Sequence, residues 1–219
     1  MKRGTLFGLG SGSKKMSWYK VFVTGGHGRL GVELQKHLPG YYPRKEEFNI
    51  NRFWDVPDCD LVVHMASYTN VDKAEDEPFG CFHTNVKGTY RMLEYFKNKP
   101  FVFLSSEHAD FPGVYFRSKL IGELMVKTLA EKHLIIRTLF KPNPWPFEYA
   151  FTDQKTQGDY VDVIAPLIAK TIQKWDGSPK SVLVGTGRKT MYELARRTKP
   201  DVKPNSVNDM PLKRPFDYV

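Results

Sequence analysis

The chain has 219 residues, of which 41% are hydrophobic and 26% charged, and its formal net charge is +9. That length supports one domain with a sizeable core and is too short for two comfortable ones. The composition is ordinary for a soluble globular protein, and no apolar run approaches the roughly 18–20 residues that span a bilayer. We therefore expect a cytoplasmic protein with no membrane partner.

The basic charge is concentrated near the N-terminus, where residues 1–15 contain four basic side chains and no acid. The moderately basic remainder suits an anionic small molecule as well as nucleic acid. No nucleic-acid-binding motif stands out, so we expect no nucleic-acid partner. Residues 1–16, rich in Gly, Ser and Lys, are interpreted as a disordered tail or a cloning remnant. The two cysteines, Cys59 and Cys81, lack metal-ligand spacing, and we expect no metal.

From residue 17 onward, short apolar segments alternate with segments of helical spacing. Strands are expected at residues 19–24, 60–66, 101–105, 134–138 and 181–184, with a poorly marked one around 40–42, and helices at 30–38, 78–97, 115–132, 162–173 and 191–197. This alternation favours parallel pairing with right-handed crossovers. The sequence predicts an α/β fold with a Rossmann-type doubly wound parallel sheet.

A glycine-rich turn follows the first expected strand directly and opens a helix: Thr24-Gly25-Gly26-His27-Gly28-Arg29-Leu30-Gly31. The glycines at positions 25, 28 and 31 would allow a tight turn, a close approach to a pyrophosphate, and close packing of helix and strand. Backbone N–H groups and the helix dipole would then face the phosphates. The strand–turn–helix context indicates a dinucleotide site.

The segment after the second expected strand indicates which dinucleotide binds. Pro43-Arg44-Lys45 precedes the first acid, Glu46. A basic residue there would accept the 2′-phosphate of NADP, whereas an acid would bind the 2′-hydroxyl of NAD. We therefore favour NADP(H) over NAD(H), with two solvated surface charges as the alternative interpretation.

Tyr115 and Lys119 are four residues apart, which places both side chains on one face of a helix. An ammonium group beside a phenol, whose ordinary pKa is near 10, favours the phenolate and lowers that pKa. Such a pair suits the proton transfer that accompanies reduction of a carbonyl. Ser105 and Ser106 end the preceding strand, where a hydroxyl could hold the substrate oxygen.

These motifs resemble those of the extended short-chain dehydrogenase/reductase superfamily, and within it the dTDP-4-dehydrorhamnose reductases. The matching segments are residues 23–31, His64 to Glu75 (N-A-A-A-Y-T-x-V-D-x-A-E in the family), Thr84 to Thr89 (V-N-x-x-G-T), Tyr115 to Glu123 (Y-G-x-S-K-x-x-G-E), residues 160–165 and Leu212-Lys213-Arg214-Pro215. The resemblance implies NADPH-dependent reduction of the 4-keto group of a nucleotide-linked 6-deoxy sugar, as in dTDP-rhamnose biosynthesis.

The resemblance also implies where the ligands bind. It gives Ser106 the hydroxyl role beside Tyr115 and Lys119 as catalytic residues. The pyrophosphate would meet residues 28–30, the adenine residues 49–50, and the nicotinamide half residues 66–68. The full cofactor-binding set expected is Gly25, Gly28, Arg29, Leu30, Arg44, Asn49, Ile50, Ala66, Ser67, Tyr68, Leu104, Tyr115 and Lys119.

We expect residues 17–219 to form one NADP-binding Rossmann domain, in which residues 139–160 and 176–219 make a small substrate-side lobe. Two departures from the family keep other functions open. The connection from Ser106 to Tyr115 is short, and Pro142, Pro144 and Pro146 occupy the stretch that should shape the sugar pocket.

One alternative is a catalytically weak NADP-binding regulatory or scaffold protein of the same fold, as the regulatory subunit of methionine adenosyltransferase resembles the same branch. Another is a nucleotide-sugar epimerase or dehydratase, for which Glu107 would supply the acid/base carboxylate. A homodimer is left open.

Overall fold

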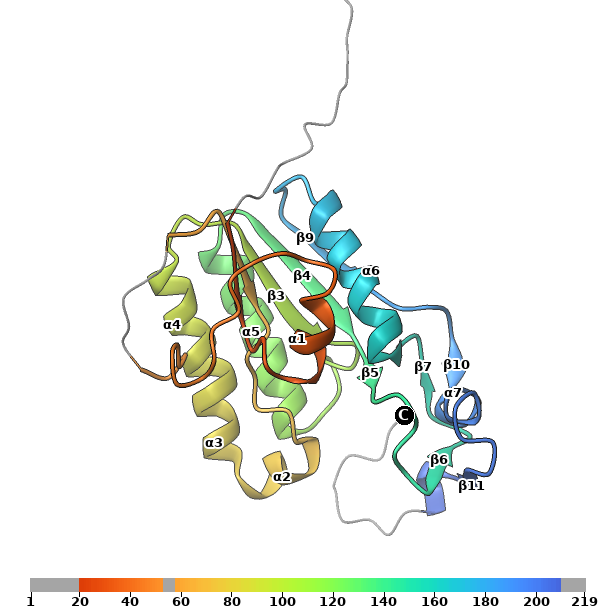
Figure 1. Ribbon diagram of the computed structural model, residues 1–219. Helices are drawn as coiled ribbons and strands as arrows, with labels where there is room; N and C mark the ends of the chain where they lie inside the picture. The colour runs from red at the N-terminus through yellow and green to blue at the C-terminus, as the bar shows by residue number, and fades with distance from the viewer. Residues whose placement is uncertain (1–19, 53–57, 210–219) are drawn as a thin grey trace, which may run out of the picture.

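The computed structural model describes residues 20–52 and 58–209. Figure 1 shows a central sheet with helices on both faces and a smaller lobe beside it. The tail interpreted at residues 1–16 and the motif Leu212-Lys213-Arg214-Pro215 lie outside the described residues. Within the described part of the chain, no helix is both long and apolar enough to cross a membrane.

The central sheet has five parallel strands, which confirms the predicted fold class. Their order is β1 (Val21–Thr24), β2 (Leu61–His64), β3 (Phe101–Ser106), β4 (His133–Thr138) and β9 (Lys180–Leu183). The poorly marked strand around residues 40–42 is reduced to one parallel bridge between Tyr41 and Phe22, on the free side of β1.

The strands are buried on both faces, which explains their continuous apolar sequences. One face packs against α1 (Arg29–Leu34) and α6 (Val161–Lys174), and the other against α4 (Gly88–Tyr95) and α5 (Val114–Leu129). A single long helix was expected over residues 78–97. The structure instead has α3 (Pro78–Phe82), a π-helical turn η1 (His83–Lys87) and α4, preceded by α2 (Val71–Asp76).

The lobe forms a third apolar cluster, separate from the two that flank the sheet, around Trp145, Tyr160, Met191 and Leu194. Its elements are β5 (Phe140–Lys141), β6 (Tyr149–Phe151), β7 (Lys155–Thr156), β8 (Asp159–Tyr160), β10 (Lys189–Thr190), α7 (Met191–Arg196), β11 (Lys203–Asn205) and the 3₁₀ turn η2 (Val207–Asp209). The sequence analysis assigns residues 176–219 to the lobe, but β9 lies in that range and belongs to the central sheet.

The chain order reverses at β1. After α1 the chain pairs Tyr41 with one side of β1, and β2 then pairs with the other side. In doubly wound sheets, ligands bind outside the carboxyl ends of the strands at such a switch point. The segments that follow β1, β2, β3 and β4 therefore border the expected crevice.

Candidate functional site

The three spaced glycines in the turn after β1 have different structural roles. Gly25 has a φ of +75°, and a Cβ added there would lie 2.7 Å from the backbone nitrogen of Ala66. A Cβ at Gly31 would collide with the carbonyl oxygen of Gly26. Gly28 is exposed, its N–H donates to the Gly25 carbonyl at 3.1 Å, and a Cβ there would meet only that oxygen. Packing thus requires Gly25 and Gly31, whereas Gly28 leaves backbone open to a ligand.

Arg44 follows the Tyr41 bridge, at the position where a basic residue would bind a 2′-phosphate. Its side chain is exposed, and its backbone N–H donates to the Glu47 carboxylate at 2.6 Å. That bond and the Glu47 N–H donating to the Arg44 carbonyl at 3.0 Å close a tight turn. The local fold therefore fixes the backbone of Arg44 and leaves its guanidinium facing solvent.

Four other residues of the expected cofactor-binding set have side chains that take part in the packing or hydrogen bonding of the fold. Leu30 is buried in the sheet core, so only its backbone can meet a ligand. Ile50 is buried against Gly88, where an added Cβ would lie 2.7 Å from its Cδ1. Asn49 is half-buried, and its Oδ1 accepts from the Asn51 N–H at 2.9 Å. Leu104 is half-buried on β3 and packs against the core on the α1–α6 face.

A buried hydrogen-bond chain connects the ends of β1 and β2 with the π-helical turn. The Ala66 N–H donates to Thr24 Oγ1 at 3.2 Å, and Thr24 Oγ1 lies 2.7 Å from His64 Nδ1. On the other side, His64 Nε2 lies 3.0 Å from Thr89 Oγ1, which donates to the Asn85 carbonyl at 2.6 Å. Because Thr89 uses its only proton for that carbonyl, Nε2 carries the imidazole hydrogen and Nδ1 accepts from Thr24.

Asn85 connects the loop after β2 to the helix that carries the tyrosine–lysine pair. Its Oδ1 accepts from the Tyr68 N–H at 2.6 Å and from Ser67 Oγ at 2.9 Å. Its Nδ2 donates to Ser118 Oγ at 2.8 Å. The Tyr68 hydroxyl donates to the Glu77 carboxylate at 3.0 Å. The sequence pattern alone gives Asn85 no role. The structure shows it as a buried amide in a π-helical turn, a feature that is frequent at functional sites.

Tyr115 and Lys119 both lie on α5, one turn apart, as predicted. The Lys119 ammonium is 4.4 Å from the centre of the Phe103 ring on β3, and its charge reaches His64 at the end of β2. Lys119 is 4% exposed and Tyr115 is half-buried. Among the described residues, the Tyr115 hydroxyl makes no hydrogen bond. α5 therefore holds the lysine against β3 and near the end of β2, one helical turn from a phenol that makes no hydrogen bond with described protein groups.

The electrostatics of this pair differ from the expectation that Lys119 lowers the pKa of Tyr115. Burial, with a smaller contribution from Cys81, raises the pKa of Tyr115 to about 12. Burial also lowers the pKa of Lys119 to about 8, against the opposing effect of Glu123. Burial dominates both shifts, because loss of water disfavours the charged form of each group, and neither side chain appreciably shifts the pKa of the other.

Ser106 ends β3 and is buried to 8% exposure. Its Oγ accepts from the His108 N–H at 3.2 Å, which leaves its own proton available. The next residue, Glu107, turns away to the lobe: its carboxylate accepts from Thr156 Oγ1 at 2.5 Å and from the Gln157 N–H at 2.7 Å. Glu107 is thus committed to joining the lobe to the sheet, which weakens the dehydratase alternative.

The short connection from Ser106 to Tyr115 is anchored by ion pairs and a helix cap. Arg137 on β4 pairs with Asp110 in the connection and with the buried Glu123 of α5, where Nε lies 2.8 Å from Oε1. Glu75 of α2 accepts from the Val114 N–H at 2.8 Å. The connection is therefore held against the sheet at Asp110, and α5 is held at its start.

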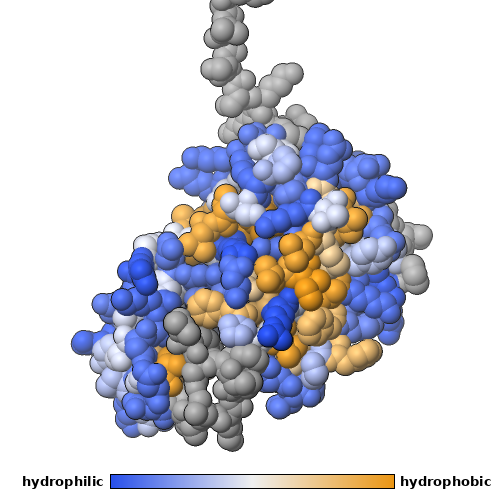
Figure 2. All heavy atoms as spheres, turned by 180° about the vertical axis from the view of Figure 1, so that it is seen from behind, coloured by the Kyte–Doolittle hydropathy of each residue, from blue (hydrophilic) through white to orange (hydrophobic). Residues whose placement is uncertain are grey.

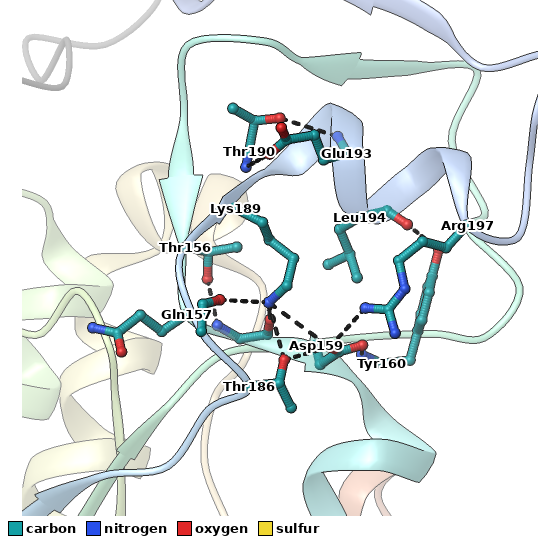
Figure 3. Close-up of polar contacts among 12 residues, drawn as sticks. Thr156, Gln157, Asp159, Tyr160, Thr186, Lys189, Thr190, Glu193, Leu194 and Arg197 are labelled. Carbon is teal, nitrogen blue, oxygen red and sulfur yellow. Dashed lines mark hydrogen bonds and ion pairs between the residues drawn. The ribbon is translucent and has the colours of Figure 1, made fainter.

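The lobe is organised around one buried carboxylate, Asp159, as Figure 3 shows. It accepts from Thr186 Oγ1 at 2.5 Å and from Arg197 Nη1 at 2.8 Å, and Lys189 Nζ lies 3.7 Å away. The neighbouring Tyr160 hydroxyl donates to the Leu194 carbonyl at 2.9 Å. These contacts fasten β8, β10 and α7 together beside the crevice. Across residues 20–52 and 58–209, no group of three His, Cys, Asp or Glu side chains is arranged to hold a metal ion.

Comparison with known proteins confirms the predicted resemblance. Residues 19–109 match the family described as RmlD substrate binding domain. A dTDP-4-dehydrorhamnose reductase of Sinorhizobium fredii (strain NBRC 101917 / NGR234) is 35% identical over 96 residues, which cover 36% of this chain and 32% of that protein. The enzyme of the same name from Aggregatibacter actinomycetemcomitans is 27% identical over 207 residues, covering 78% of this chain and 68% of that protein. The chain thus spans about a third of the first relative and two thirds of the second.

A solved structure agrees with the fold. The crystal structure of dTDP-4-dehydrorhamnose reductase from Bacillus anthracis str. Ames in complex with NADP matches with a TM-score of 0.71 and 21% identity. The match covers 85% of this chain and 84% of that chain. The likeness in fold therefore extends over most of the chain.

Proposed function

We propose that this chain, a relative of the dTDP-4-dehydrorhamnose reductases, is an NADPH-dependent reductase of a nucleotide-linked 4-keto-6-deoxy sugar. The observation that carries the proposal is one of placement: Ser106 ends β3, α5 carries Tyr115 and Lys119 one turn apart, and the glycine turn follows β1 of the same sheet. A proton donor, a cation and a hydroxyl then border the same crevice as a dinucleotide-binding turn.

The residues present fit NADP(H) at this turn. The open backbone at Gly28 and the exposed Arg29 are suited to the pyrophosphate, and the exposed Arg44 to the 2′-phosphate. The bound cofactor would supply the hydride. The loop at residues 66–68, held by Thr24 and Asn85, is the wall against which we place the nicotinamide half.

In this proposal Tyr115 donates the proton that the carbonyl oxygen needs. With a pKa of about 12, the phenol holds its proton at neutral pH. Lys119, with a pKa of about 8, is mostly charged there and stabilises the phenolate that remains after transfer. The Ser106 hydroxyl, whose proton is free, orients the carbonyl oxygen toward Tyr115.

A second candidate is the catalytically weak NADP-binding regulator. The short connection between Ser106 and Tyr115 favours it, because ion pairs hold this connection against β4 and leave little chain to enclose a sugar. The complete Ser106–Tyr115–Lys119 set favours the enzyme. Glu107 points to the lobe, so we do not pursue the epimerase or dehydratase alternative.

The test is NADPH oxidation with a dTDP-4-keto-6-deoxy sugar. We expect turnover, and we expect Tyr115→Phe to lower kcat by about 10²–10⁴-fold with NADPH affinity unchanged, as for loss of a general acid. Tyr90→Phe, which alters an exposed tyrosine on α4 outside the substrate-side lobe, is the matched control and should keep full activity. Tight NADPH binding without turnover on any keto sugar would instead favour the regulator.

We propose further that the protein is a cytoplasmic homodimer. Figure 2 shows apolar side chains gathered on the face opposite the view of Figure 1. A groove over α3, η1, α4 and α5 is lined by Phe79, Phe82, His83, Val86, Lys87, Tyr90 and Met125. Phe79 is 82% exposed, which is unusual for a large apolar side chain.

Sedimentation measurements test the dimer. Phe79→Asp should yield monomers, whereas Val32→Asp, a change at an exposed apolar residue on α1, should leave the dimer intact. Wild-type protein that sediments as a monomer would refute this part of the proposal.

A further inference from the structure

Lys141 is a lysine in the crevice region that the sequence analysis did not single out. It ends β5, the short strand that follows β4, and its side chain is half-buried. Its ammonium lies 5.9 Å from the Trp145 ring centre and 5.7 Å from the Phe147 ring centre. The aliphatic stem and the charge are therefore held between the central sheet and the aromatic segment of the lobe.

Three charged or titratable groups from other elements reach Lys141 electrostatically. Arg29 begins α1 after the glycine turn, Asp72 lies in the first turn of α2 after β2, and His108 lies in the connection after β3. Each of these segments leaves the carboxyl end of a parallel strand. Lys141 thus faces the same edge of the sheet at which the expected crevice opens.

The positive charges of Lys141 and Arg29 are not neutralised by contacts within the described part of the protein. Among the described residues, neither the Lys141 ammonium nor the Arg29 guanidinium makes a hydrogen bond or an ion pair. Burial, together with the nearby Arg29, lowers the pKa of Lys141, with Asp72 opposing that effect. Burial also lowers the pKa of His108 and favours its neutral form, and a histidine side chain in either form carries no negative charge that could offset the two cations. A partly buried cation without a partner is costly, and an anionic ligand would remove that cost.

Lys189 is a lysine whose ammonium group is bound by protein groups, and it serves as a comparison for Lys141. Its ammonium donates to the Gly158 carbonyl at 2.7 Å and to the Gly187 carbonyl at 2.8 Å, and it lies 3.7 Å from Asp159. Figure 3 shows these contacts converging on it. Lys189 is saturated by protein groups, whereas Lys141 is held in place by aromatic rings and keeps its donors available.

We propose that Lys141, with Arg29, binds a phosphate group of a nucleotide ligand at the junction of the glycine turn and the lobe. This inference rests on the proposed function, which brings two diphosphates to the crevice: that of the cofactor and that of the nucleotide-linked sugar. Arg29 adjoins the turn expected to bind the cofactor, while Trp145 and Phe147 belong to the lobe expected to bind the sugar nucleotide. The shared chemistry is a diphosphate anion, and separate ligands can distinguish its source.

The experiment is a pair of titrations of the full chain, one with NADPH followed by fluorescence and one with dTDP followed by calorimetry. Lys141→Met keeps the length of the stem and removes the charge. Loss of one charge-assisted hydrogen bond predicts about tenfold or greater weakening for at least one ligand. Weakening with NADPH alone identifies the cofactor phosphates, and weakening with dTDP alone identifies those of the sugar nucleotide.

Two further variants control for folding and for general charge. Lys141→Arg keeps the cation and should retain most of the affinity. Lys170→Met removes an exposed lysine from α6 and should change neither affinity. Unchanged binding of both ligands by Lys141→Met would overturn the proposal. If wild-type protein binds both ligands but reduces no keto sugar, the proposed function fails and the role of Lys141 still stands or falls on the titrations.

Discussion

The central sheet and the lobe are stabilised by different means. Leu134, Ile135 and Ile136 of β4 are each 0% exposed, and apolar helices cover both faces of their sheet. The lobe has a smaller apolar cluster and depends on the buried Asp159, which joins three of its elements. The catalytic candidates lie on the sheet and on α5, whereas we propose that the lobe contributes the substrate side. Substitutions in the sheet should therefore destabilise the whole fold, whereas substitutions in the lobe should mainly affect the lobe and substrate binding.

The largest expected effect is on the sheet. Ile135→Ala removes a buried side chain from the centre of β4, and we expect it to lower the free energy of unfolding by about 4 kcal/mol. Urea denaturation measures the change, with the exposed Val32→Ala as a control that should have little effect. The loss should be global, because β4 contacts both β3 and β9. A destabilisation below about 1 kcal/mol would contradict the assignment of β4 to the core.

The next effect is local to the lobe. Asp159→Ala removes the carboxylate shared by Thr186 and Arg197, and we expect a cost of about 3 kcal/mol. Hydrogen exchange should accelerate in β8, β10 and α7 while the amides of β1 to β4 remain protected. Asp201→Asn, at an exposed position, is the control. Equal acceleration in the sheet would show that lobe and sheet unfold as one unit.

A smaller effect concerns the dependence of stability on pH. Burial, reinforced by Lys119, lowers the pKa of His64 to about 3, whereas the unfolded chain restores a value near 6.5. Between pH 3 and pH 6.5 the unfolded state binds more protons than the folded state. The free energy of unfolding is therefore highest above pH 6.5 and decreases as the pH falls. The linkage predicts a loss of about 2 kcal/mol between pH 6.5 and pH 5.

Comparison of two variants isolates this contribution. His64→Asn should remove that part of the slope, and His37→Asn, at an exposed position, should leave it unchanged. Denaturant titrations at several pH values measure both. An identical slope in wild type and His64→Asn would mean that His64 is not buried in its neutral form.

The sequence predicted the parts of the molecule that follow from local pattern. The glycine turn was predictable because positions 25 and 31 tolerate no side chain, and the helix of Tyr115 and Lys119 because its spacing places both on one face. The π-helical turn was not, since its five residues share the composition of the helices around it. The role of Asn85 becomes visible only when Tyr68 and Ser118 converge on it.

Burial accounts for the remaining differences. The motif suggested that Lys119 would lower the pKa of Tyr115, but no sequence pattern reveals how completely water is excluded from either group. The same reason hides Lys141, because a lysine at the start of a segment rich in proline and aromatic residues gives no sign that its charge is partly buried without a protein partner.

The most direct test of the central claim follows the hydride itself. The protein is incubated with a dTDP-4-keto-6-deoxy sugar and NADPH that carries deuterium at the transferable nicotinamide position, and the product is examined by mass spectrometry. We predict one deuterium on the carbon that bore the keto group, and about 10²-fold or more less labelled product from Tyr115→Phe over the same initial period. An unlabelled product from the wild-type protein, or equal labelling by the Tyr115→Phe variant, would contradict the account.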